Sequence, residues 1–402
     1  MPKLLQMGKG SAGLLLWSII PAAFIGPGTV TTCSKAGASF GLALVWALTF
    51  SIIATMVLQE AAARITIASG KTLGQLIGTR YRGRTATWLK VFLFGSAALG
   101  CTAYQAGNLL GAVSGLQLVS TTPPKYWLAG LGLVAAILLW TGSIRIITSA
   151  MAIIVFLMGL AFVVVGVQAP VSAPALAKSL VVPSFPEGSG LLIIGLIGTT
   201  VVPYNLFLGS GLSKGQHVSE MRKSLLPAIL IGGIISLAIV LTGAQVSGEF
   251  SFAALAATLE NGLGPWAGDF FGFGLFAAGI SSAITAPFAA AITGQAIFGN
   301  GRPNWSTRSR NFRLVWAVVL GAGLLFGLTG VKPIPAIIAA QAANGFLLPI
   351  VAIFLWMVVN DRKLLPKRYL NSHAANALMA VVVLIVTGLG LYNLWKVVVG
   401  LL

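Results

Sequence analysis

The chain has 402 residues, of which 57% are hydrophobic and only 8% are charged. A soluble domain carries about 25% charged residues, so the composition excludes a soluble protein and indicates an integral membrane protein. The formal net charge of +18 does not indicate a nucleic-acid partner, because the basic residues lie in the connections between apolar segments.

Long apolar segments follow one another through the whole chain, without the alternation of polar and apolar residues that is typical of a transmembrane β-barrel. We therefore predict an all-α integral membrane protein with eleven spans, using a window of about 20 residues. The expected spans are residues 14–38, 41–67, 88–116, 126–141, 145–167, 189–212, 225–247, 267–298, 313–329, 333–359 and 374–400.

The basic residues predict the orientation of these spans. With a cytoplasmic N-terminus, nearly all of the 25 Lys and Arg residues fall on the cytoplasmic side. Lys125, Lys178, Lys332 and Lys396 fall outside, and Lys35 lies within a span. This asymmetry is typical of multi-pass proteins. We predict a protein of the plasma (inner) membrane with an extracytoplasmic C-terminus and no cleavable signal peptide.

Two of the expected spans are interrupted in the middle by glycine or proline. The first contains Gly-Pro-Gly-Thr at residues 26–29, and the sixth contains Val-Pro-Tyr-Asn at residues 202–205. Interrupted spans at matching positions of two halves indicate the substrate site of a transporter. Unwound backbone is stable at membrane depth only where protein or water satisfies its amide groups.

Acidic residues are almost absent from the spans. Six of the seven acids fall in loops or at span ends, and Glu60 is the exception. Arg64 lies one turn further on the same face, and because the two lie near the cytoplasmic end of their helix, we expect a structural ion pair rather than a functional one. Both histidines, His217 and His373, fall in cytoplasmic connections. We therefore predict neither a metal site of acidic or histidine ligands nor a set of catalytic residues, and we expect no cofactor and no enzyme activity.

Instead, the first interruption is followed by a lysine and several hydroxyl groups. Lys35 lies six residues after Thr29, about 9 Å along a helix. If the helix restarts after Gly28, its unpaired N–H groups favour an anion at the interruption. The alternative for Lys35 is that it extends to the membrane interface without contacting substrate.

At these residues the chain resembles the NRAMP family of divalent-metal transporters. The first helix of that family reads Asp-Pro-Gly-Asn and then Gln-Ala-Gly-Ala, and here residues 26–29 precede Lys-Ala-Gly-Ala at residues 35–38 with the same spacing. The sixth helix of the family reads Met-Pro-His-Asn-Leu-Phe-Leu-His-Ser, which matches residues 202–210 in part. Further similarity is found in the second and eighth helices and at Gln341 in the tenth.

The resemblance implies a LeuT-type inverted repeat of 5+5 transmembrane helices plus an eleventh helix. Residues 1–167 would form the first repeat, residues 168–188 an extracellular linker that we expect to be a surface loop, residues 189–359 the second repeat, and residues 360–402 a loop and the last span. The resemblance also shows what is replaced. Gly26 stands at the family's metal-binding aspartate, Thr29 at its asparagine and Val202 at its methionine, and Tyr204 replaces a histidine.

These departures predict a secondary transporter of a small anion, with bicarbonate as the specific substrate, working by alternating access in the lipid bilayer. Bicarbonate is chosen partly because the family resemblance brings with it a bicarbonate-carrying branch, and chloride, nitrate or formate would satisfy the same residues. The alternative is a divalent cation, Mg²⁺ or Mn²⁺, bound in a roomier site, and a non-transporting sensor or scaffold is a third class. The coupling ion is left open between H⁺ and Na⁺.

The expected substrate-binding residues are Gly26, Pro27, Gly28, Thr29, Thr31, Thr32, Lys35, Val202, Pro203, Tyr204, Asn205 and Gln341.

Overall fold

The structure is a computed structural model that describes residue 17 and residues 25–80, 83–141, 145–299 and 303–400. In these ranges the regular elements are helical. The α-helices are α3 (Pro27–Phe40), α4 (Val45–Ser69), α5 (Leu73–Arg80), α6 (Gly83–Val119), α7 (Pro124–Thr141), α8 (Arg145–Val167), α9 (Ala173–Val181), α10 (Gly190–Thr200), α11 (Pro203–Leu212), α12 (Val218–Gly243), α13 (Phe252–Leu263), α14 (Trp266–Gly294), α15 (Arg310–Leu328), α16 (Pro333–Val359) and α17 (His373–Gly400). Short turns of other helix types are η2 (Gln295–Gly299), η3 (Pro303–Trp305) and η4 (Lys367–Tyr369).

The expected spans coincide closely with these helices. In the described part of the chain, nine helical segments are long and apolar enough to cross a membrane, and Met151–Val167 is a shorter apolar helix. Residues 14–16 and 18–24 of the first expected span lie outside the described residues. The protein is therefore a multi-pass, all-helical membrane protein.

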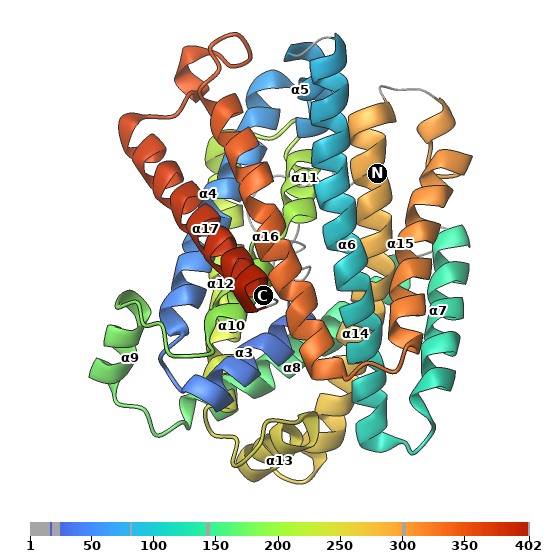
Figure 1. Cartoon of the computed structure of the whole chain (residues 1–402), viewed down its shortest axis with the longest axis vertical. Helices are drawn as coiled ribbons and strands as arrows, with labels where there is room; N and C mark the ends of the chain where they lie inside the picture. The colour runs from blue at the N-terminus through green and yellow to red at the C-terminus, as the bar shows by residue number, and fades with distance from the viewer. Residues whose placement is uncertain (1–16, 18–24, 81–82, 142–144, 300–302, 401–402) are drawn as a thin grey trace.

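The two ends of the molecule differ in charge. Helices α9 and α13 lie at one end, and α5 and the connection from α16 to α17 lie at the opposite end (Figure 1). The connections and helix termini at the α5 end carry Lys71, Lys90, Lys214, Arg222, Lys223, Arg308, Arg310, Arg313, Arg362, Lys363, Lys367 and Arg368. We predict that this end is cytoplasmic, since basic residues accumulate on that side of a membrane.

The expectation of a plain surface loop at residues 168–188 was wrong in one respect, because part of this connection is helical. Helix α9 begins after Ser172, whose side chain accepts a hydrogen bond from the Ala175 N–H, and a proline stands in its first turn. Helix α13 begins in the same way after Ser251, which accepts from the Ala254 N–H at 3.0 Å. An N-cap serine followed by helix-forming residues is a recognised start signal. Both helices have too few residues to cross a membrane, and the prediction of spans therefore did not include them.

Small residues allow the central helices to approach closely. Helix α3 packs against α12, α16 and α10, and α6 packs along α14. A Cβ atom added at Gly37 of α3 would overlap the Val240 carbonyl oxygen of α12. A Cβ at Gly279 of α14 would overlap the backbone of Ala112 on α6. Without a hydrophobic driving force between helices in lipid, this close backbone packing holds the bundle together.

We expect Gly37→Ala to destabilise the protein by about 1–3 kcal/mol, because the added methyl group meets backbone atoms that move only if α3 and α12 separate. The matched control is Gly95→Ala on α6, where an added Cβ has no neighbour within 4 Å. That variant is expected to be neutral or slightly more stable, since alanine favours a helix over glycine. Thermal unfolding in detergent measures both, and equal midpoints for the two variants would contradict the packing argument.

Candidate functional site

The first interrupted segment places a helix start deep in the protein. Gly26 has an extended conformation (φ −135°, ψ −171°) and precedes α3, with Pro27 at the first position. Proline is well suited to this position because it has no N–H to leave unpaired. Gly26 has no side chain that could cap the helix. The first N–H groups of α3 therefore point at the interruption and give that region a partial positive charge.

The second interruption separates α10 from α11. Helix α10 ends at Thr200, residues Val201 and Val202 are not helical, and Pro203 begins α11. Val202 likewise provides no side-chain cap. The carbonyl end of α10 and the N–H end of α11 therefore meet here, and both ends of a peptide dipole are available to a bound ion.

The two interruptions are in direct contact. The hydroxyl groups of Thr29 on α3 and Thr199 on α10 share a hydrogen bond of 2.7 Å. From α6, the Tyr104 hydroxyl donates to the Gly198 carbonyl oxygen at 2.8 Å, and its ring stands edge-on to that of Tyr204 with 6.2 Å between centroids. Residues from α3, α6, α10 and α11 thus form one buried centre.

Gln341 joins this centre from α16. A Cβ atom added at Gly28 would overlap the Gln341 side-chain amide, so that amide lies directly against the start of α3. In the same way, a Cβ atom added at Gly198 of α10 would overlap the Gln341 backbone carbonyl oxygen. The lack of side chains at Gly28 and Gly198 is what allows α3, α10 and α16 to converge.

Several polar atoms in this centre have no hydrogen-bond partner among the described residues. They include both amide atoms of Asn205 and both amide atoms of Gln341, although each of these residues is at most 1% exposed. An unpaired buried amide costs about 1–3 kcal/mol, and such a cost is retained at functional sites. These four atoms are two donors and two acceptors that can bind a solute.

The remaining expected residues of α3 lie further along the helix. Thr31, Thr32 and Ser34 are fully buried with hydroxyl groups that have no partner in the described part, and Thr32 packs near Gly195 of α10. Lys35 is half-buried, and its ammonium group lies over the Phe250 ring, 5.8 Å from the centroid. Phe250 belongs to the connection between α12 and α13. This cation–π contact therefore lies in the C-terminal half of α3, next to the connection that leads into α13. The role of Lys35 in substrate binding stays a prediction.

Among the residues that the structure describes, no carboxylate or imidazole lies at the interruptions. Glu60 pairs with arginines on α4 and α12, and the other six acids lie in terminal turns, on α13 or in connections: Glu187, Glu220, Glu249, Glu260, Asp269 and Asp361. Both histidines stand at helix starts at the α5 end. Within the described ranges, no three His, Cys, Asp or Glu side chains lie together.

Three further residues of the centre were not among the expected ones: Tyr104, Thr199 and Ser282. The Ser282 hydroxyl on α14 is the nearest neighbour of a Cβ added at Gly26, at 3.1 Å. Thr199 lies in the turn before the second interruption, and that position was the available sequence signal. Tyr104 and Ser282 come from unbroken helices, and only the packing of α6 and α14 brings them here.

Comparison with known proteins settles the family. The family model described as Nramp, natural resistance-associated macrophage protein-like, matches residues 18–396. The chain belongs to the NRAMP family. Among its relatives, the divalent metal cation transporter MntH of Verminephrobacter eiseniae is 27% identical over 361 residues, which cover 84% of this chain and 79% of the relative.

Solved structures of similar proteins define the fold of this NRAMP chain. A variant of the Eremococcus coleocola manganese transporter superposes with a TM-score of 0.72 at 20% identity, covering 97% of this chain and 86% of that one. MhsT in complex with L-phenylalanine superposes with a TM-score of 0.61 at 15% identity, covering 95% and 97%. The NRAMP chain therefore has the LeuT-type fold expected from its sequence. Its membership of the NRAMP family makes it a secondary transporter rather than an enzyme.

Proposed function

We propose that this NRAMP-family protein transports a small planar anion, specifically bicarbonate, through the centre between the two interruptions. The observation that carries the proposal is a neutral site. It presents helix N-termini, hydroxyl groups and two buried amides, and no carboxylate of the described part of the chain lies in it. Oriented N–H groups and neutral donors stabilise an anion.

Lys35 adds to this preference even without touching the substrate. Its position six residues beyond Thr29 corresponds to about 9 Å of helix rise. A unit charge about 9 Å from an anion attracts it by about 2 kcal/mol at an effective dielectric constant near 20, and this sets the scale of the long-range effect of the Lys35 ammonium, which lies over Phe250. The same charge repels a divalent cation by about twice as much.

A divalent cation is the second candidate, and the comparisons favour it. The relative from Verminephrobacter eiseniae is named a divalent metal cation transporter, and the structural neighbour from Eremococcus coleocola is named a manganese transporter. The amide oxygens of Asn205 and Gln341 and the carbonyl end of α10 are hard ligands that suit a largely hydrated Mg²⁺. The missing carboxylate counts against this candidate, since nothing offsets two positive charges.

Uptake into proteoliposomes distinguishes the two candidates. We expect saturable uptake of labelled bicarbonate, with nitrate and formate as competitors and no change on adding a metal chelator. Asn205→Leu is expected to lower this uptake at least tenfold, because it removes one of the two buried amides that can bind the anion. Asn304→Leu, at an exposed position of η3, is the matched control and should have no effect. Uptake of Mn²⁺ or Mg²⁺ without bicarbonate uptake would overturn the anion proposal and support the second candidate.

A further inference from the structure

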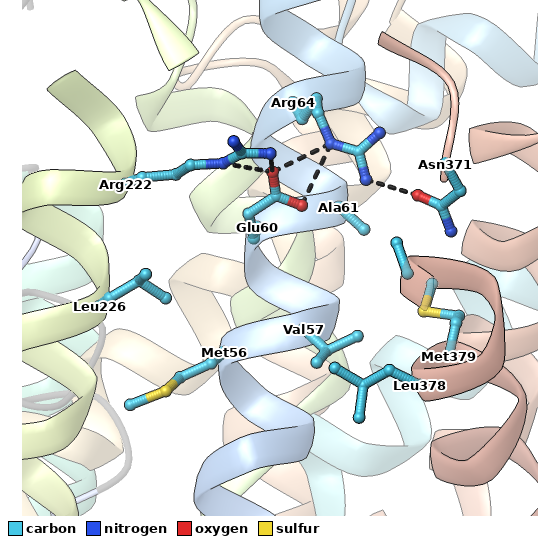
Figure 2. Close-up of a pocket in the computed structure, with 11 residues that line it drawn as sticks. Met56, Val57, Glu60, Ala61, Arg64, Arg222, Leu226, Asn371, Leu378 and Met379 are labelled. Carbon is cyan, nitrogen blue, oxygen red and sulfur yellow. Dashed lines mark hydrogen bonds and ion pairs between the residues drawn. The ribbon is translucent and has the colours of Figure 1, made fainter. Parts of the chain in front are cut away.

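An ion cluster at the α5 end of the molecule is separate from the transport site. Figure 2 shows Glu60 of α4 between Arg64 of the same helix and Arg222 of α12. Arg64 Nε lies 3.0 Å from Glu60 Oε1, and Arg222 Nη2 lies 2.6 Å from the same oxygen. One carboxylate thus faces two guanidinium groups, and the cluster carries one excess positive charge.

The two arginines differ in how many of their donors are used. Arg64 has a side chain only 8% exposed, and its Nη1 and Nη2 donate to the Tyr369 carbonyl and to Asn371 Oδ1. Arg222 has a side chain 51% exposed, and both of its hydrogen bonds go to Glu60 Oε1. The excess charge is therefore presented by Arg222.

An apolar pocket of about 230 Å³ begins beside this cluster. Met56 and Val57 lie one helical turn before Glu60 on α4, and Leu226 lies one turn after Arg222 on α12. Helices α4 and α12 cross the membrane in opposite directions. Met56, Val57 and Leu226 therefore all lie further from the α5 end of the molecule than the charged groups do. Leu378 and Met379 of α17 close the opposite wall (Figure 2).

The pocket is therefore polar at the membrane surface and apolar toward the membrane interior. A soluble anion would gain nothing from the apolar wall, and a purely apolar ligand would leave the guanidinium group of Arg222 without a new partner. An anionic phospholipid fits both parts, since its phosphate accepts hydrogen bonds from arginine and its acyl chain removes apolar side chains from water. Basic pockets between spans on the cytoplasmic side suit such headgroups.

We propose that the pocket between α4, α12 and α17 binds an anionic phospholipid of the cytoplasmic leaflet, with its phosphate at Arg222 and one acyl chain against Met56, Leu226 and Leu378. Glu60 lowers the net charge of the cluster and holds Arg222 in place. Arg64 acts as a positioning residue, because it fixes Glu60 and joins α4 to the segment that precedes α17.

Lipid titration of the purified full-length chain, followed by native mass spectrometry, tests the proposal. We expect phosphatidylglycerol to bind at least tenfold more tightly than phosphatidylcholine with the same acyl chains. Arg222→Gln is expected to lower the affinity for phosphatidylglycerol about tenfold. The matched control is Lys223→Gln, which removes the same charge from the next residue of α12, outside the pocket, and should leave the affinity unchanged.

Two further variants separate the charge from the apolar wall. Glu60→Gln should raise the affinity for phosphatidylglycerol, because two guanidinium groups then face the phosphate; a merely structural ion pair predicts no such gain. Leu378→Trp places a larger side chain in the apolar part of the pocket, at a position whose side chain is already 43% exposed. This variant should lower the affinity for phosphatidylglycerol. Equal binding of both lipids, equal effects at Arg222 and Lys223, or equally tight binding of glycerol 3-phosphate alone would each overturn the proposal.

Discussion

Gly26→Asp is expected to lower anion uptake by roughly a thousandfold. Gly26 precedes the first turn of α3, so an aspartate there places a negative charge at the interruption. At about 4 Å from a bound anion, that charge costs about 4 kcal/mol at an effective dielectric constant near 20, which corresponds to this loss of affinity. Uptake of labelled bicarbonate at increasing substrate concentration measures the effect.

The variant is expected to fold. The backbone of Gly26 is extended and accepts any side chain, and aspartate is a favoured N-cap residue. The nearest neighbour of the added Cβ is the Ser282 hydroxyl at 3.1 Å, which a rotation of the serine side chain relieves. Gly26→Asn is the matched control, because asparagine has nearly the same size and capping ability without the charge. If both variants lowered anion uptake equally, the electrostatic account of the site would be wrong.

Arg64→Ala is expected to destabilise the protein by about 3 kcal/mol, in the range found when one partner of a buried ion pair is removed. The Arg64 guanidinium is nearly buried and binds Glu60, the Tyr369 carbonyl and Asn371. Its removal takes the donor away from the Tyr369 carbonyl and from Asn371 Oδ1, leaves Glu60 paired with Arg222 alone, and breaks the link between α4 and the connection before α17. Thermal or denaturant-induced unfolding in detergent measures the loss.

Arg222→Ala is the matched comparison, because it removes the second arginine from the same carboxylate. Its side chain is half exposed, and exposed ion pairs contribute about 0–1 kcal/mol. We therefore expect a small change in stability for Arg222 and a large one for Arg64. Similar changes for both would show that the hydrogen bonds to Tyr369 and Asn371 contribute little.

The positions of the helices could be predicted because they depend on local sequence. A membrane span needs about 20 apolar residues, and the expected ranges 126–141, 145–167 and 333–359 each lie within two residues of α7, α8 and α16. The Glu60–Arg64 pair was predictable for the same reason, since residues four apart face each other on any helix. The nine residues of α9 were missed because they are too few to form an apolar run.

The helix starts at Pro27 and Pro203 and the scarcity of carboxylates followed from the sequence alone, because proline limits the backbone locally and the sequence contains only seven acids. Only the tertiary structure decided which side chains meet there. Gln341 reaches Gly28 across more than three hundred residues, Thr29 bonds to Thr199, and Lys35 lies against Phe250. Such contacts depend on how closely whole helices approach, and that distance is set by small residues on both partners, which no single segment of sequence determines.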